Sequence, residues 1–150
     1  MTKTEPTRPD QQDWEAFLAE PHIGVLAVAS DDGRPPLAVP VWHHYEPGGE
    51  LTFFTGTQGR TARKTRLIER AGVVSFTVQK SDPPYKNATI EGRVVGIDRP
   101  PSHEQMLAIV RRYLPEEMAQ GFVAAELANP GPTLVLFRIR PERWLTADFS

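Results

Sequence analysis

The chain has 150 residues, a formal net charge of −2 and no cysteine; this length suits one domain with a sizeable core, and the composition excludes disulfides, thiolate nucleophiles and zinc–thiolate sites. The slightly acidic charge balance argues against an extended nucleic-acid-binding surface, and no apolar run approaches the roughly 20 residues of a membrane span. No secretory signal is recognisable, so we expect a cytoplasmic protein whose partners include neither nucleic acid nor membrane.

The N-terminal part of the chain is predicted to contain one helix. Residues 1–9 have two prolines and no apolar periodicity, which predicts a disordered lead-in to a single domain over 10–150. Asp10 can cap a helix that ends at Pro21 and turns one apolar side toward the core. That side consists of Trp14, Phe17 and Leu18.

Three extended segments follow this helix. The segments 23–29, 37–45 and 51–55 are rich in apolar residues, and turn-forming residues separate them at 30–33 and 46–49. This pattern predicts three consecutive antiparallel strands that form a meander.

The segment 55–66 places basic residues at the start of a predicted helix. The core-facing stripe of a helix that begins near residue 60 contains Leu67, Ile68 and Ala71. Arg60 and Lys64 fall in the same stripe and therefore point toward the protein body. Cations oppose the helix dipole at an N-terminus, whereas the free backbone N–H groups there attract an anion, so we expect a bound phosphate. The alternative is a solvated basic face, which fits Arg66 and Arg70 on the outer side of the helix.

The second half of the chain begins with two more strands. Segments 73–79 and 88–97 are rich in β-branched residues, and the proline-containing loop 81–85 that joins them is a candidate rim of a site. Ser102 and Gln105 then match a capping box, which predicts a helix from residue 102.

A second helix, about 116–127, and a last strand, 134–139, complete the predicted elements, and the strand reaches Trp144. The strands follow one another without the helix crossovers that a parallel sheet needs. We therefore predict a mainly β fold with inserted helices, a six- to seven-stranded antiparallel split β-barrel, because barrel formation limits exposed strand edges.

Catalytic and metal-binding motifs are weak in this sequence. The histidines have neither H-x-H nor i, i+4 spacing, which predicts no metal site, and no nucleophile, Walker or dinucleotide-binding motif occurs. The histidines are His22, His43, His44 and His103. A further alternative is a haem-handling split barrel in which His43 serves as the axial ligand of a haem.

A ligand groove is predicted between the strand around residues 39–43 and the segment 55–64. Successive strand residues offer backbone groups to a flat aromatic ligand, threonines add hydroxyls, and the basic residues can hold a terminal phosphate. This combination indicates a flavin-type cofactor. The candidate binding residues are Pro40, Val41, Trp42, Thr55, Gly56, Thr57, Arg60, Thr61, Arg63 and Lys64.

With these residues in place, the chain resembles the pyridoxamine 5′-phosphate oxidase-like split barrels, also called flavin and deazaflavin oxidoreductases. The similarity runs from about Glu20 to Val95 and, more loosely, to residues 141–144. It rests on the order and spacing of several short matches. These are His22-Ile23-Gly24-Val25-Leu26-Ala27, Asp32-Gly33-Arg34-Pro35, Val39-Pro40-Val41-Trp42, Phe53-Phe54-Thr55-Gly56, Ala62-Arg63-Lys64-Thr65-Arg66, Val74-Ser75-Phe76 and Ile90-Glu91-Gly92.

The resemblance implies an F420- or FMN-dependent oxidoreductase that transfers hydride to or from a small organic substrate. It implies that residues 40–42 and Thr55 border the cofactor ring and ribityl chain, that Arg63 and Lys64 bind the phosphate, and that two cofactor sites form at a homodimer interface. Ala62 stands where flavin-binding members have serine, and the C-terminal Arg-Leu-x-Pro segment of true pyridoxamine phosphate oxidases is missing. The resemblance therefore does not extend to that particular activity. The alternative is a non-catalytic carrier of the same cofactor.

Overall fold

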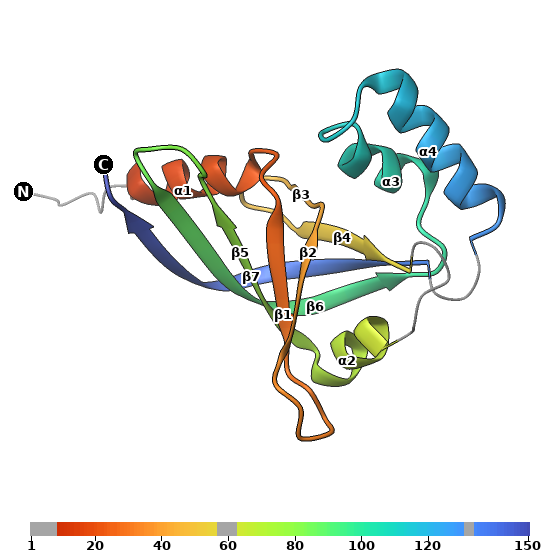
Figure 1. Ribbon diagram of the computed structural model, residues 1–150, viewed down its shortest axis with the longest axis horizontal. Coiled ribbons are helices and arrows are strands. Elements are labelled where there is room, and N and C mark those ends of the chain that lie inside the picture. The colour runs from red at the N-terminus through yellow and green to blue at the C-terminus, as the bar shows by residue number, and fades with distance from the viewer. Residues whose placement is uncertain (1–8, 57–62, 131–133) are drawn as a thin grey trace, which may run out of the picture.

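The computed structural model describes residues 9–56, 63–130 and 134–150, which form four helices and one seven-stranded antiparallel sheet (Figure 1). The sheet order is β2-β1-β5-β6-β7-β4-β3, so β2 and β3 are its edges. The predicted mainly β, antiparallel split barrel is thereby confirmed. The strands are β1 (Gly24–Val28), β2 (Leu37–Val41), β3 (His44–Tyr45), β4 (Leu51–Thr55), β5 (Val73–Gln79), β6 (Lys86–Asp98) and β7 (Val135–Asp148), and the helices are α1 (Pro9–Ala19), α2 (Arg63–Ala71), α3 (His103–Val110) and α4 (Glu116–Ala128).

The predicted meander is wrong, because the chain leaves the sheet between β2 and β3. β2 pairs with β1, whereas β3 pairs with β4, and the two lie at opposite edges of the sheet. The break falls at Trp42 and His43. The His43 side chain is fully buried and bonded to parts of the chain outside the sheet. These long-range contacts override a local pattern that reads as one continuous strand.

The main core lies between the concave side of the sheet and the helices α1 and α2. Phe17 and Leu18 contribute from α1, and Leu67 and Ile68 from α2, to a cluster that includes Phe53, Phe76 and Phe137 of the sheet. The helix predicted from the apolar side of residues 14–18 is confirmed, although it begins at Pro9 rather than after a cap at Asp10. Burial of such large apolar side chains is the main stabilising contribution to the fold.

Gly24, at the start of β1, allows one close approach within this core. A Cβ atom built on Gly24 would lie 1.9 Å from Cζ of Phe76. The Phe76 ring therefore occupies the space that any other residue at position 24 would need, and this fixes the ring beneath the beginning of β1.

The helices α3 and α4 form a hairpin inserted between β6 and β7, beside the end of β4 (Figure 1). The capping box is confirmed, since the Ser102 hydroxyl accepts from the Gln105 amide while the Gln105 side chain accepts from the Ser102 amide. The hairpin has its own apolar cluster, which includes Met106 and Val123 and packs against Trp42 and other aromatic side chains. None of the helices in the described ranges is long and apolar enough to cross a membrane.

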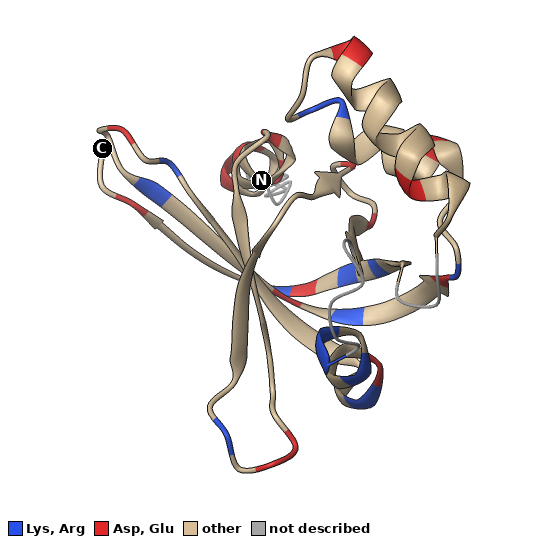
Figure 2. Cartoon of the chain, turned by 45° about the vertical axis from the view of Figure 1, so that its right-hand side comes forward, with Lys and Arg blue, Asp and Glu red and all other residues tan. Residues whose placement is uncertain are grey.

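The basic helix α2 is held against the turn that joins β1 and β2. Asp31 pairs with Arg66 and with Arg70, whose Nη1 lies 3.5 Å from its carboxylate, and Arg63 Nη2 donates a 3.0 Å hydrogen bond to Ser30 Oγ. Figure 2 shows lysine and arginine gathered along this helix. Arg66 and Arg70 are exposed, as the predicted outer side of the helix requires. Together these pairs place the first turn of α2 relative to the sheet.

The loop 81–85 does not have the predicted position. It joins β5 to β6, and the backbone amide of Phe149 bonds to Tyr85 O, so the loop lies beside the C-terminal end of β7. This end of the sheet adjoins α1, away from the α3–α4 hairpin (Figure 1).

Candidate functional site

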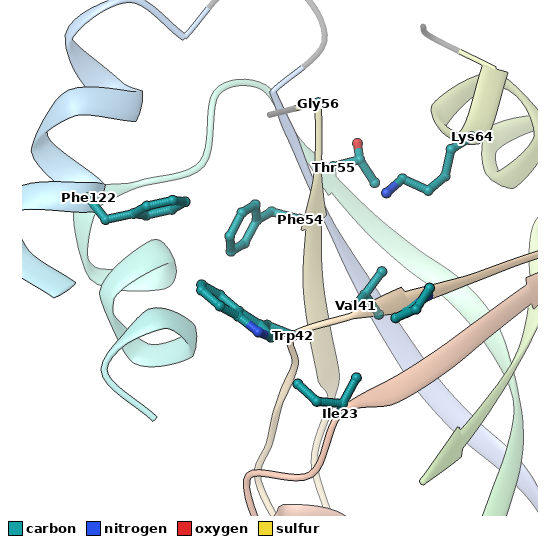
Figure 3. Close-up of a pocket in the computed structure, with 9 residues that line it drawn as sticks. Ile23, Val41, Trp42, Phe54, Thr55, Gly56, Lys64 and Phe122 are labelled. Carbon is teal, nitrogen blue, oxygen red and sulfur yellow. The ribbon is translucent and has the colours of Figure 1, made fainter. Parts of the chain in front are cut away.

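A cavity of about 370 Å³ opens where the ends of β2 and β4 meet the start of α2 and one side of α4. This volume lies within the usual range for small-molecule sites. Figure 3 shows the lining side chains arranged around it. They are Ile23, Pro40, Val41, Trp42, Phe54, Thr55, Gly56, Lys64 and Phe122.

One side of the pocket is aromatic. The Trp42 and Phe122 ring centroids are 6.0 Å apart, and those of Phe54 and Phe122 are 6.4 Å apart. The three rings come from the chain after β2, from β4 and from α4, and they gather on one side of the cavity (Figure 3). Rings at these separations make favourable tilted contacts and offer flat apolar surfaces to a planar ligand.

Among the described residues, the other side of the pocket carries a single charge. Lys64, in the first turn of α2, extends its ammonium group toward Thr55 at the end of β4 (Figure 3). Burial lowers the pKa of Lys64, and no residue in the described ranges forms an ion pair with it. A partly desolvated ammonium group without a carboxylate partner favours an anionic ligand, because the ligand would replace the lost hydration.

A hydrogen bond between two threonines places Lys64. Thr55 Oγ1 and Thr65 Oγ1 lie 2.8 Å apart and both residues are buried. The bond joins the last residue of β4 to the first turn of α2. Since Lys64 precedes Thr65, this contact fixes the helix start at the pocket margin.

The structure brings six of the ten candidate binding residues to this one cavity. They are Pro40, Val41, Trp42, Thr55, Gly56 and Lys64. Thr57, Arg60 and Thr61 lie outside the described residues. Arg63 does not line the cavity, because its guanidinium group turns to Ser30 and to Asp32 at 3.9 Å; its Nε is buried without a hydrogen-bond partner.

Three lining residues were not anticipated from the sequence. Ile23 and Phe54 directly adjoin segments that the prediction included, so strand continuity could have indicated them. Phe122 lies in α4, far along the chain, and packs beside Trp42 only because the α3–α4 hairpin folds back onto the sheet. No local signal in the sequence marks it as a pocket residue.

His43 is a structural residue rather than a pocket residue. Its Nε2 donates a 2.7 Å hydrogen bond to the Leu18 carbonyl, and its Nδ1 lies 3.1 Å from the Tyr113 hydroxyl. Burial lowers the pKa of His43 to about 4, so the ring is neutral at pH 7. Because its Nε2 is bonded to the Leu18 carbonyl and its side chain is fully buried outside the cavity lining, His43 is not placed to serve as the proposed axial haem ligand in this conformation. Within the described residues, no group of three side chains is arranged to hold a metal ion.

The fold is that of the antiparallel split-barrel β proteins, with a pocket at the strand ends. The family profile described as pyridoxamine 5′-phosphate oxidase matches residues 11–148. The chain belongs to this family. A comparison with curated proteins gave no significant match.

Several solved structures share the fold. An F420 reductase is 26% identical with a TM-score of 0.66, and the match covers 87% of this chain and 94% of that one. A conserved hypothetical protein from Mycobacterium tuberculosis is 20% identical with a TM-score of 0.69, covering 99% and 86%. An FAD-binding protein from Mesorhizobium loti is 20% identical with a TM-score of 0.57, covering 91% and 90%.

Proposed function

We propose that this protein is an oxidoreductase that binds FMN or coenzyme F420 in the pocket around Lys64 and transfers hydride to or from a small organic substrate. The observation that carries the proposal is the position of the Lys64 ammonium group, which is the only charged group among the described residues that line this largely apolar cavity. Both cofactors combine a flat ring system with a phosphate-linked anionic tail. When bound, such a cofactor supplies the hydride chemistry.

The residues present fit such a ligand. Lys64 would hold the anionic group through a charge-assisted hydrogen bond. Trp42, Phe54 and Phe122 would provide apolar contact and exclude water. In the described sheet β2 pairs only with β1, so backbone groups on its other side take no part in sheet pairing and would be offered to the polar edge of a planar ring. The similarity to an F420 reductase and to an FAD-binding protein supports this reading.

We further propose that the protein is a homodimer whose interface includes the convex face of the sheet. Residues Pro40, Val25, Thr77, Thr89 and Leu145 are register neighbours across five strands and form an uncharged row. Val25 is 42% exposed and Leu145 is 46% exposed. Because Pro40 belongs to this row and also lines the pocket, a second copy on this face would border the cofactor site.

The dimer proposal is tested by measuring molar mass in solution. We expect a dimer for the natural sequence and a monomer for Val25→Glu, because a carboxylate within the row would be buried without a partner. Met118→Glu is the control, since Met118 is 59% exposed on α4 and lies outside the row. A monomeric natural protein contradicts the proposal.

The cofactor proposal is tested by the absorption spectrum of protein purified from its own host and by titration with FMN and with F420. Binding of either should raise the melting temperature. A colourless protein that responds to neither cofactor contradicts the proposal. Anaerobic reduction of the bound cofactor, followed by a screen of enone and quinone acceptors, separates an enzyme from a carrier, since a carrier shows no acceptor-dependent reoxidation. The carrier alternative is favoured by one observation: the nine lining residues in the described part of the chain include no histidine, tyrosine or carboxylic acid.

A further inference from the structure

Two walls of the pocket lie just outside the strands that carry them. Ile23 precedes the first residue of β1, and Trp42 follows the last residue of β2. Backbone pairing in the sheet begins at Gly24 and ends at Val41 in the register of these two strands. The sheet therefore positions the neighbours of Ile23 and Trp42 but not these two residues, and other contacts must hold them.

Tyr113, in the connection between α3 and α4, supplies those contacts. Its ring stacks on the Trp42 indole, with centroids 5.1 Å apart and planes 5° from parallel. Its hydroxyl donates a 2.8 Å hydrogen bond to the His22 carbonyl, directly before Ile23, and accepts a 3.3 Å hydrogen bond from the His43 amide, directly after Trp42. One side chain thus contacts both chain segments that carry these walls.

The connection that bears Tyr113 is itself fastened to the end of α1. Helix carbonyls in the last turn lack partners within their own helix. In α1, the carbonyl of Leu18 accepts a hydrogen bond from His43 Nε2, and that of Ala19 accepts one from Arg112, the residue before Tyr113. His43 and Arg112 therefore cap the C-terminal end of α1. Tyr113 follows Arg112 in the chain and contacts His43, so both residues beside it are bonded to α1. This anchoring makes Tyr113 a fixed support rather than a loose contact.

We infer that Tyr113 is a positioning residue of the pocket, whose ring orients Trp42 and whose hydroxyl holds the segments 22–23 and 42–43 at the spacing that a ligand requires. The inference rests on the proposed function only in taking this cavity as the ligand site. Tyr113 does not line the cavity and acts through its neighbours.

The test uses the full chain with Tyr113→Phe, which keeps the ring, and Tyr113→Leu, which removes both ring and hydroxyl. Tyr85→Phe is the matched control, because Tyr85 is 53% exposed in the loop between β5 and β6. The first readout is the near-ultraviolet circular dichroism of the ligand-free protein, with Trp42→Phe as the reference for the indole signal. The second is hydrogen exchange at the His43 amide, and the third is the dissociation constant for FMN and for F420.

We expect Tyr113→Leu to abolish the Trp42 signal and Tyr113→Phe to retain it. Tyr113→Phe should accelerate His43 amide exchange and weaken ligand binding, each by about 3- to 10-fold, the loss expected for one net hydrogen bond. Tyr85→Phe should change none of these. An unaltered Trp42 signal in folded Tyr113→Leu, or His43 exchange and ligand affinity that Tyr113→Phe leaves unchanged, overturns the inference.

Failure of the proposed function is distinguishable from failure of this inference. If the natural protein binds neither FMN nor F420, the cofactor proposal fails, and the Trp42 signal and the His43 exchange rate still decide the role of Tyr113. If Tyr113→Leu does not fold, Tyr113→Phe decides through exchange and affinity.

Discussion

Thr55 and Thr65 share a buried 2.8 Å hydrogen bond between their hydroxyl groups. It joins the end of β4 to the first turn of α2 and thereby sets Lys64 at the margin of an aromatic cavity. The basic helix is not simply a charged surface segment, because one of its cations is turned inward while Arg66 and Arg70 are paired with Asp31 on the outside. The placement of α2 is therefore central to the proposed chemistry.

Lys64→Met should weaken the binding of FMN or F420 by about 1.5 to 3 kcal/mol, the contribution typical of a hydrogen bond to a charged group. The free energy of unfolding of the ligand-free protein should stay the same or rise, because a partly desolvated ammonium group is replaced by an apolar side chain of similar length. Titration calorimetry and urea unfolding measure the two quantities. Arg70→Met, on the exposed side of the same helix, is the control. A large loss of stability in Lys64→Met would mean that the lysine is structural.

Phe122→Ala should weaken cofactor binding without changing the anion contact. The substitution removes the α4 wall of the pocket and exposes the ring of the ligand to water. We expect the free energy of FMN binding to become less favourable by about 1 to 2 kcal/mol. The affinity of the pocket for inorganic phosphate, measured by its competition with FMN, should stay unaltered. Met118→Ala, one turn earlier in α4 and exposed, is the matched control. Equal effects of the two substitutions would contradict a specific role for Phe122.

Thr65→Val should lower the free energy of unfolding by about 1 kcal/mol, since it removes one buried hydrogen bond with little change in shape. It should also weaken ligand binding, because Lys64 loses its support. Tyr45→Phe is the comparison: it removes a 2.9 Å hydrogen bond to Glu15 of α1, away from both the cavity lining and the proposed interface row. Both variants should lose stability in urea unfolding, but only Thr65→Val should lose ligand affinity. If Thr65→Val leaves ligand affinity unchanged, the hydrogen bond between Thr55 and Thr65 does not position Lys64 for binding.

Stability should fall as pH decreases from about 6.5 to about 4. Burial lowers the pKa of His43 to about 4 against 6.5 for an ordinary histidine, and the charges of Arg112, His22 and His44 act in the same direction. In this interval the unfolded chain binds a proton at position 43 that the folded chain does not, so the stabilisation is complete above pH 6.5 and declines below it. The total loss is about 3 kcal/mol.

Urea unfolding at a series of pH values measures this dependence. His43→Gln should have lower stability at pH 7 and a shallower decline with acid. His103→Gln removes an exposed histidine at the start of α3 and controls for the substitution itself. Burial also lowers the pKa of His44 and adds to the decline with the same sign. If the free energy of unfolding declines equally steeply with acid in the natural protein and in His43→Gln, His43 is not the origin of the pH dependence.

Local pattern predicted most of the elements. The strand predicted at 73–79 is β5 itself, the capping box at Ser102 begins α3, and the helix predicted at about 116–127 is α4. In each case a periodicity, a cap or a turn signal lies within a few residues of the element that it specifies. Local physical chemistry is sufficient where the controlling contacts are also local.

Local pattern failed where distant contacts decide. The segment 37–45 has the composition of one strand, yet Tyr113, 70 residues from His43, binds the point at which it breaks. Phe122 and Tyr113 reach the pocket only through the folding of the hairpin, and Arg63 turns to Ser30 because the β1–β2 turn lies beside α2. No window of neighbouring residues contains these relationships.

By itself, the sequence determined the class of fold, the presence of a basic helix after β4, and the inward direction of Lys64, because apolar periodicity defines which side of a helix is buried. Only the tertiary structure decided which cations face the cavity, which aromatic rings complete its walls, and what holds Trp42 in place. The physical reason is that side-chain packing and hydrogen bonding between elements distant along the chain depend on their relative placement in space, and sequence spacing does not encode that placement directly.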